Sequence, residues 1–195
     1  MADRNEILGA AQGAFNADPS ASMSAVAEAA GISRATLHRH FDSREALLVE
    51  LGTRSLDQWA GRLDEVDAEA LAASGDAPAI RAALETLVLG YVDDSDGFGF
   101  ALTDHVILAN ADLEERTRVL ADREAVLFAA AQRVGVLRPD LPPRWFGHAI
   151  YGLLVSAREA VRIGDVARRD VGHLVLSSLL AGIVQPATTR NRSTP

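Results

Sequence analysis

The sequence predicts an all-α protein, and three observations support that fold class. Apolar residues recur with a helical period in almost every segment, and no stretch alternates in the way that a half-buried strand does. Capping residues and helix breakers, such as NADPSAS and RPDLPP, separate these segments. The chain has 195 residues, 48% of them hydrophobic, which is enough for a substantial buried core. We therefore expect a soluble globular protein built from helices and short loops.

Two helices are expected before residue 31. The first covers residues 4–16, and NADPSAS ends it. Its apolar face consists of Ile7, Leu8, Ala11, Ala14 and Phe15. The second covers about 24–30, with Ser22 as its N-cap and Val26 facing inward.

A tight turn leads into a third helix, expected at residues 34–40. Gly31 can adopt the left-handed conformation that ends a helix, and the hydroxyl of Ser33 can cap the next one. Ile32 and Leu37 then occupy the two positions of a hydrophobic staple. We therefore expect a rigid angle between the second and third helices.

The third helix has an apolar inner face and a polar outer face. At 100° per residue, Leu37 and Phe41 share the inner face. The outer face and its two flanks carry Ala35, Thr36, His38, Arg39 and His40. This arrangement suits a helix that reads the major groove of DNA, with Arg39 opposite a guanine and Ala35 opposite a thymine methyl group.

The first fifty residues resemble the N-terminal helix-turn-helix domain of TetR-family transcriptional regulators. The resemblance rests on three stretches, which read ILGAAQGAF, MSAVAEAAGIS and RATLHRHFDSREALL. The residues that fit the family pattern are Thr36, Leu37, His40, Phe41, Glu45 and Leu47. His38 stands where tyrosine is usual and Arg44 where lysine is usual, and both can still donate to phosphate. The resemblance implies a sequence-specific DNA-binding regulator.

Positive charge is concentrated where the DNA contacts are expected. These contacts are Ser24, Ser33, Arg34, Ala35, Thr36, His38, Arg39, His40 and Arg44. The first 50 residues hold four arginines against seven carboxylates, but residues 34–44 hold three arginines, two histidines and one aspartate. Because the formal net charge of the chain is −8, we expect weak binding to random DNA.

The rest of the chain is expected to form a larger helical bundle. The expected helices cover 44–72, 78–92, 98–109, 113–135, 142–163 and 168–184. ASGDAP, DDSDG, NAD, RPDLPP and IGDV break them. Leu113, Leu120 and Leu127 recur every seven residues, so the helix at 113–135 is expected in the centre of the core.

The last two expected helices, 142–163 and 168–184, are apolar on more than one face. The small residues that would permit close approach are Gly147, Gly152, Ser156, Ser177 and Ser178. We expect the surplus face to pair with its copy in a homodimer, as the family resemblance also implies. The dimer would place two reading helices about 34–36 Å apart on a near-palindromic operator. The alternative is a monomer in which these helices form the deepest core.

The resemblance also implies a pocket for a small-molecule effector. The candidate effector-binding residues, which can equally belong to an ordinary core, are Trp59, Tyr91, Phe100, His105 and Phe128. Because few charges lie on these stripes, we expect an apolar or weakly polar ligand. We accordingly divide the chain into a DNA-binding domain at 1–46, an effector-binding and dimerisation domain at 47–185, and a flexible tail at 186–195.

Several function classes lack support in the sequence. The chain has no cysteine, which excludes disulfides, thiolate metal sites and thiol nucleophiles. No signal-peptide pattern and no membrane-length apolar run occur, so we expect a cytoplasmic protein without a membrane partner. No catalytic motif, metal site or cofactor loop is complete, and we expect none.

The sequence therefore predicts a homodimeric transcriptional regulator, more specifically a repressor that a small effector releases from its operator. Two alternatives remain open. One is a helical ligand-binding protein without DNA function, and the other is a helical enzyme that uses His105 or His148. Replacing Arg39 with alanine discriminates among them, because only the regulator would lose specific DNA binding.

Overall fold

The computed structural model describes residues 3–183, with side chains described as far as residue 180. All regular secondary structure in this range is helical and no strand occurs in it, which confirms the predicted fold class. The helices are α1 (Arg4–Ala17), α2 (Met23–Ala29), α3 (Arg34–His40), α4 (Arg44–Glu65), α5 (Ala68–Ser74), α6 (Ala77–Phe98), η1 (Gly99–Leu102), α7 (His105–Leu108), α8 (Ala111–Arg133), α9 (Pro143–Ile163), η2 (Arg168–Asp170) and α10 (Val171–Ile183). The expected tail at 186–195 lies outside the described residues, as does residue 184 of the last expected helix.

Three serine N-caps start the helices of the N-terminal region. Ser22, Ser33 and Ser43 each accept a hydrogen bond from the backbone N–H three residues further on. These bonds satisfy donors that a helix start otherwise leaves unpaired. The starts of α2, α3 and α4 therefore follow from local sequence.

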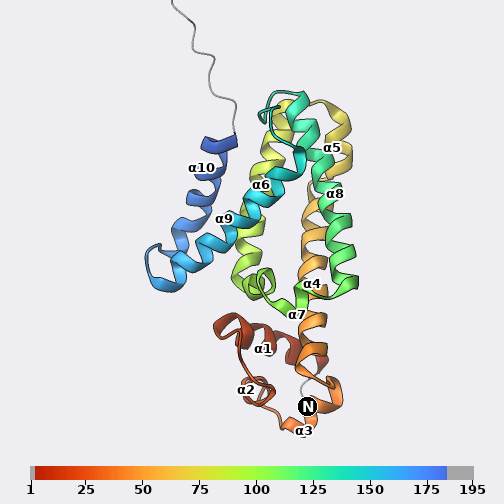
Figure 1. Cartoon of the computed structure of the whole chain (residues 1–195), viewed down its shortest axis with the longest axis vertical. Helices are drawn as coiled ribbons and strands as arrows, with labels where there is room; N and C mark the ends of the chain where they lie inside the picture. The colour runs from red at the N-terminus through yellow and green to blue at the C-terminus, as the bar shows by residue number, and fades with distance from the viewer. Residues whose placement is uncertain (1–2, 184–195) are drawn as a thin grey trace, which may run out of the picture.

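Two apolar clusters form the core. The first is built by α1, α2, α3 and the first half of α4, and its fully buried side chains include Ile7, Leu8, Phe15, Leu37, Leu47 and Leu51. The second lies between α4, α5, α6, α8, α9 and α10. Figure 1 shows α1, α2 and α3 at one end of the molecule, with α4 leading from them into the larger bundle. Phe98, Phe100 and Ile107 also pack into the first cluster, so the two regions share a core.

The predicted single helix at 44–72 is wrong. Asp67, between α4 and α5, has a left-handed backbone with φ 49°, which an α-helix cannot contain. Arg123 of α8 stabilises the bend because it pairs with both Asp64 and Glu69, on either side of it. The bend turns α5 against α8 and caps the far end of the bundle.

The predicted break at DDSDG is wrong as well, because α6 continues through it to residue 98. Arg62 of α4 donates two hydrogen bonds to Asp94, at 3.0 and 3.1 Å, and thereby pairs a charge within this stretch. The hydroxyl of Ser95 donates to the carbonyl of Val92 at 2.7 Å. The stretch therefore stays helical despite its polar composition.

The predicted helix at 98–109 is also incorrect, since two short helices, η1 and α7, replace it. Asp104 separates them because its side chain accepts hydrogen bonds from the N–H groups of Val106 and Ile107 and so begins α7. α4 crosses the expected domain division at 46/47 without interruption, and that division stays a prediction. In the described part of the chain, no helix has the length and apolar character needed to cross a membrane.

Candidate DNA-reading face and ligand cavity

The turn before α3 has the predicted geometry. Gly31 is left-handed, with φ +64°, and the Ser33 hydroxyl accepts from the backbone N–H of Thr36 at 3.1 Å. Leu37 is fully buried, and Ile32 packs half-buried against the same cluster. Local contacts thus fix the direction of α3 relative to α2.

α3 presents its predicted reading face to solvent. Ala35, His38 and Arg39 are exposed on it. Arg39 Nη2 donates to Thr36 Oγ1 at 3.0 Å, and that hydroxyl lies 2.9 Å from Ser33 Oγ. These contacts orient the Arg39 guanidinium along the helix. In Figure 1, α3 lies at the far end of the molecule from α5, where a partner can approach it.

Arg34 and Arg39 carry unpaired positive charge on this face. In the described chain, no carboxylate lies within ion-pair distance of either guanidinium. Ser24 is exposed in the first turn of α2, and His40 is half-buried at the end of α3. Unpaired guanidinium groups are suited to phosphate and to base acceptors.

Arg4 positions α3, and sequence reasoning missed this residue. Its Nη1 donates to the carbonyl of His40 at 2.6 Å, while Nε and Nη2 both donate to the carboxylate of Glu50. The guanidinium also lies 4.2 Å above the centre of the Phe41 ring. These contacts tie α1 to the end of α3 and to α4. They join residues 36 and more positions apart, so no local pattern announces them.

Arg44 is engaged within the molecule. Its Nε donates to the carbonyl of Ala21 at 3.1 Å, its Nη2 donates to that of Pro19, and its guanidinium lies 5.0 Å from the centre of the Phe15 ring. These contacts attach the α1–α2 loop to the start of α4. The expected phosphate contact of Arg44 stays a prediction, and the structure adds a positioning role for the side chain.

The five effector candidates separate into two groups. Tyr91 and Phe128 line a cavity in the larger bundle, and Trp59 donates a hydrogen bond to Tyr91. Phe100 is buried in the first apolar cluster instead, and His105 is exposed in α7. The structure therefore does not bring Phe100 or His105 to this cavity, because η1 folds back onto the N-terminal region.

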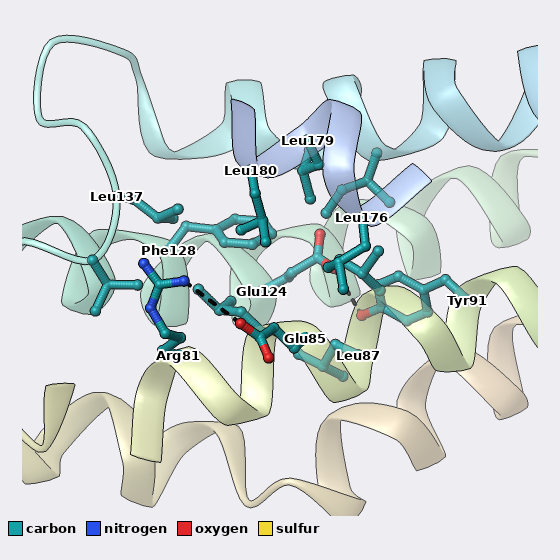
Figure 2. Close-up of a pocket in the computed structure, with 14 residues that line it drawn as sticks. Arg81, Glu85, Leu87, Tyr91, Glu124, Phe128, Leu137, Leu176, Leu179 and Leu180 are labelled. Carbon is teal, nitrogen blue, oxygen red and sulfur yellow. Dashed lines mark hydrogen bonds and ion pairs between the residues drawn. The ribbon is translucent and has the colours of Figure 1, made fainter. Parts of the chain in front are cut away.

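The cavity between α6, α8, α9 and α10 is almost closed. Aliphatic side chains form most of its wall, and Figure 2 shows Leu176, Leu179 and Leu180 of α10 covering one side. The side chains with polar atoms in the lining are Arg81, Glu85, Tyr91 and Glu124. The free volume is about 20 Å³, roughly enough for one water, whereas drug-sized ligands occupy about 300–1,000 Å³. A ligand of that size must therefore displace side chains of the wall.

Glu124 places a buried carboxyl group in this apolar wall. Its exposed fraction is 4%, and its Oε1 accepts a hydrogen bond from the Tyr91 hydroxyl at 2.8 Å. That hydroxyl in turn accepts from the indole N–H of Trp59 at 3.1 Å. Burial raises the pKa of Glu124 to about 7, and burial beside Glu124 raises the pKa of the Tyr91 phenol as well. The hydrogen bonds join α4, α6 and α8.

Sequence reasoning also missed Glu124, although its spacing gives a signal. It lies four residues after Leu120 and three before Leu127, on the buried stripe of α8. A charged residue at such a position faces the core.

α9 and α10 have more apolar surface than the core uses. Phe146, Ile150 and Leu154 of α9 are buried against α6 and α8. Large apolar side chains remain exposed on the outer sides of the two helices, namely Trp145, Tyr151, Ile163 and Leu174. The surplus apolar face is therefore present, while its pairing with a second copy stays a prediction.

The remaining histidines form no cluster in the described residues. His148 and His173 are exposed on α9 and α10. Between residues 3 and 183, no three His, Asp or Glu side chains lie close enough together to hold a metal ion.

Comparisons with known proteins agree with this arrangement. Residues 7–51 match the family model described as bacterial regulatory proteins, tetR family. The chain is 26% identical over 181 residues to the HTH-type transcriptional repressor LfrR of Mycolicibacterium smegmatis, covering 93% of this chain and 90% of that protein. The crystal structure of LfrR in complex with proflavine has a TM-score of 0.70 and 25% identity, covering 94% of this chain and 98% of that one. The ketosteroid transcriptional regulator KstR2 of Mycobacterium tuberculosis shares the fold, with a TM-score of 0.68, 20% identity and coverage of 94% and 95%.

The match and the geometry coincide. The residues of the family model include those that build the turn, the outer face of α3 and the N-terminal part of the first apolar cluster. The similarity to LfrR extends over almost the whole chain, including the helices that enclose the cavity. The chain therefore carries the N-terminal domain of the TetR family of bacterial regulatory proteins, and it is similar over almost its whole length to the transcriptional repressor LfrR.

Proposed function

We propose that this regulator is a repressor that binds a near-palindromic operator through the outer face of α3. The observation that carries the proposal is the pair of exposed, unpaired arginines, Arg34 and Arg39, on a helix whose direction its own turn fixes. Arg39 suits the O6 and N7 acceptors of a guanine, and Ala35 suits a thymine methyl group. The similarity to LfrR, a repressor, supports the sign of the regulation.

The phosphate contacts that we propose flank these base contacts. They come from Ser24, Ser33, Arg34, Thr36, His38, His40 and Arg44. Contacts of this kind set the position and orientation of the protein on the duplex and carry no sequence information themselves. We therefore expect their loss to weaken binding to all sequences alike.

The operator is proposed to bind a homodimer that forms through the outer sides of α9 and α10. The exposed apolar side chains Trp145, Tyr151 and Ile163 on α9 and Leu174 on α10 support this choice of surface. A two-fold symmetric dimer requires a self-complementary patch, and two half-sites about 34–36 Å apart on one face of the duplex. The two half-sites of the operator are therefore expected to be related by the same two-fold symmetry.

We assign the effector site to the cavity that Tyr91 and Phe128 line. The complex of LfrR with proflavine supports a flat small molecule as the ligand. Because the free volume is only about 20 Å³, such a ligand binds an expanded form of the bundle in preference to this one. Effector binding thus shifts the equilibrium between two shapes.

α4 and α6 are proposed to carry this change to the reading face. α4 begins directly after α3 and contributes Trp59 beside the cavity, while α6 contributes Tyr91 and ends at Phe98 in the first apolar cluster. Both helices therefore belong to both regions. A coupling free energy of about 1–3 kcal/mol between effector and operator is sufficient for a useful switch.

The test is the binding of the chain to the duplex upstream of its own gene, compared with a scrambled duplex, by fluorescence anisotropy over a range of salt. The unaltered protein should bind the first duplex about 10³-fold or more tightly than the second. Arg39→Ala should lose about 1–3 kcal/mol of that discrimination, because it removes a bidentate base contact. The melting temperature should not change, since Arg39 is exposed.

The matched control is Arg118→Ala, which removes the same charge from an exposed position on α8. It should leave both affinities unchanged. If Arg39→Ala retains the full discrimination, the proposed reading face is wrong. If neither that duplex nor any site selected from a random duplex pool binds specifically, the operator function itself is wrong, and a helical ligand-binding protein without DNA function replaces it.

A further inference from the structure

A carboxyl group lies in the cavity wall where an ordinary core would have an apolar side chain. The exposed fraction of Glu124 is only 4%. Its side chain faces the leucines of α10 across the cavity, as Figure 2 shows. Burial of an ionised carboxylate without a cation costs several kcal/mol, so cores rarely contain one. The position therefore calls for an explanation beyond packing.

No arginine neutralises Glu124 in the described residues. Arg81 lines the same cavity, but it forms an ion pair with Glu85 at 3.5 Å on its own helix. Arg62 of α4 is occupied by two hydrogen bonds to Asp94. The partners of the Glu124 carboxyl are instead the Tyr91 hydroxyl and, behind it, the Trp59 indole.

A glycine on α9 leaves space for the second carboxyl oxygen of Glu124. A Cβ atom at Gly147 of α9 would lie only 3.0 Å from Glu124 Oε2. The absence of a side chain there lets this oxygen occupy the interface of α8 and α9 beside the cavity. Of the two oxygens, Oε1 accepts from Tyr91, while among the described residues no arginine forms an ion pair with Oε2.

We propose that Glu124 is the counter-ion for a cationic group of the effector, so that the ligand class is a flat, largely apolar molecule carrying a protonated amine or amidine. This inference rests on the proposed function of the cavity. The ligand cation supplies the charge that the protein lacks, and the aromatic rings of Tyr91 and Phe128 contact its apolar body. It departs from the expectation of an apolar or weakly polar ligand, which did not take Glu124 into account.

The pKa of Glu124 agrees with this geometry. Because burial raises it to about 7, the carboxyl is close to the point at which a nearby cation converts it into a carboxylate. Tyr91 remains a neutral donor, since its own pKa is raised well above the ordinary value. The other charged groups in the cavity lining, Arg81 and Glu85, form their own pair.

The experiment compares two ligands of the same ring system, one cationic and one neutral. Proflavine is a cation at about pH 8, whereas acridine is neutral there. Because proflavine also carries two amino groups that acridine lacks, the contribution of the charge is isolated by repeating the comparison in Glu124→Gln. Equilibrium dialysis should give a proflavine affinity about tenfold or more above that of acridine, equivalent to about 1.4 kcal/mol. Glu124→Gln should abolish most of this preference and leave acridine binding within about twofold.

The control is Glu115→Gln, which removes the same charge from an exposed position on the same helix and should preserve the preference. If Glu124→Gln does not fold, the unaltered protein still decides the question. Its affinity for proflavine should rise about tenfold between about pH 6 and pH 8, as Glu124 loses its proton.

The outcomes separate this inference from the function on which it rests. Equal affinities for the two dyes in the unaltered protein, or a preference that Glu124→Gln retains, overturn the role of Glu124 and leave the effector cavity in place. If neither dye binds, and neither releases the operator, both the counter-ion and the proposed effector site are overturned. Operator binding without any dye should be the same in the variant and the parent.

Discussion

The proposed reading end and the proposed ligand cavity of this regulator are built in opposite ways. At the reading end, Gly31, Ser33 and Leu37 lie within seven residues of one another, and their contacts orient α3. The cavity assembles Tyr91 and Glu124, which lie 33 residues apart, on separate helices. Local contacts thus fix the orientation of α3 independently of the rest of the fold. The cavity depends on contacts between distant helices, and a single substitution in its wall can change its chemistry.

The two regions are nevertheless expected to unfold together. Phe15 is fully buried, and its ring lies 5.9 Å from that of Phe100, which belongs to the larger region. Phe15→Ala should therefore cost about 3–5 kcal/mol, the usual result of removing a buried phenylalanine. Urea unfolding followed by tryptophan fluorescence and by circular dichroism measures this cost.

Both tryptophans lie in the larger region, so the two probes report different parts of the chain. We expect their transitions to coincide in the parent and in Phe15→Ala. If the fluorescence midpoint stays at its original urea concentration in the variant while the circular dichroism midpoint falls, the regions unfold separately and the shared core does not couple them.

The buried carboxyl should make stability decrease with rising pH. Glu124 has an ordinary pKa of 4.5 in the unfolded chain and a pKa of about 7 in the folded one, so the folded state holds its proton more tightly. Below about pH 4.5, Glu124 is protonated in both states and does not lower the free energy of unfolding. The loss of stability grows as the pH rises to about 7 and is constant above that. Its full size is about 3 kcal/mol, at about 1.4 kcal/mol per pKa unit.

Glu124→Gln should accordingly raise the free energy of unfolding by up to about 3 kcal/mol at about pH 8 and change it little at about pH 4.5. The amide oxygen can still accept from Tyr91, so the hydrogen bond is retained. Thermal unfolding at both pH values measures the difference. The Arg81–Glu85 pair and Asp94, which Arg62 neutralises, are the nearby charges and are common to both proteins. Equal stability at about pH 8 would contradict the burial of an ionised group.

The smallest effect separates capping from recognition. Ser22→Ala and Ser33→Ala each remove one N-cap hydrogen bond and should cost about 1 kcal/mol of stability. Only Ser33 also contacts Thr36 Oγ1, the atom that holds Arg39. Ser33→Ala should therefore weaken operator binding several-fold more than Ser22→Ala does, as measured by anisotropy. Equal losses would mean that the Thr36 contact has no part in orienting Arg39.

The sequence predicts well those features whose causes are local. The serine caps, the left-handed Gly31 and the exposed face of α3 each depend on residues a few positions apart. The same reasoning fails where distant residues decide. Arg62 keeps α6 helical through DDSDG by pairing with Asp94, 32 positions away, and this partner cannot be read from the stretch itself.

The candidate site divides along the same line. The reading-face residues follow from spacing, but Arg4 contacts His40 only in the folded molecule. Phe100 looked suitable for the cavity because it is aromatic, yet η1 places it in the first apolar cluster. The sequence shows Glu124 as an acidic residue on an apolar stripe, but only the folded structure shows that no arginine of the described residues pairs with it.

The unbroken length of α4 has a mechanical consequence. From Arg44 at its start to Trp59 beside the cavity, the helix advances about 22 Å, at about 1.5 Å per residue. A tilt of about 5° at the cavity therefore moves the base of α3 by about 2 Å, and in the proposed dimer it changes the separation of the two α3 helices by about 4 Å. That displacement exceeds one base-pair step of about 3.4 Å, so a rotation hardly visible at the ligand can move two recognition helices out of register with the groove.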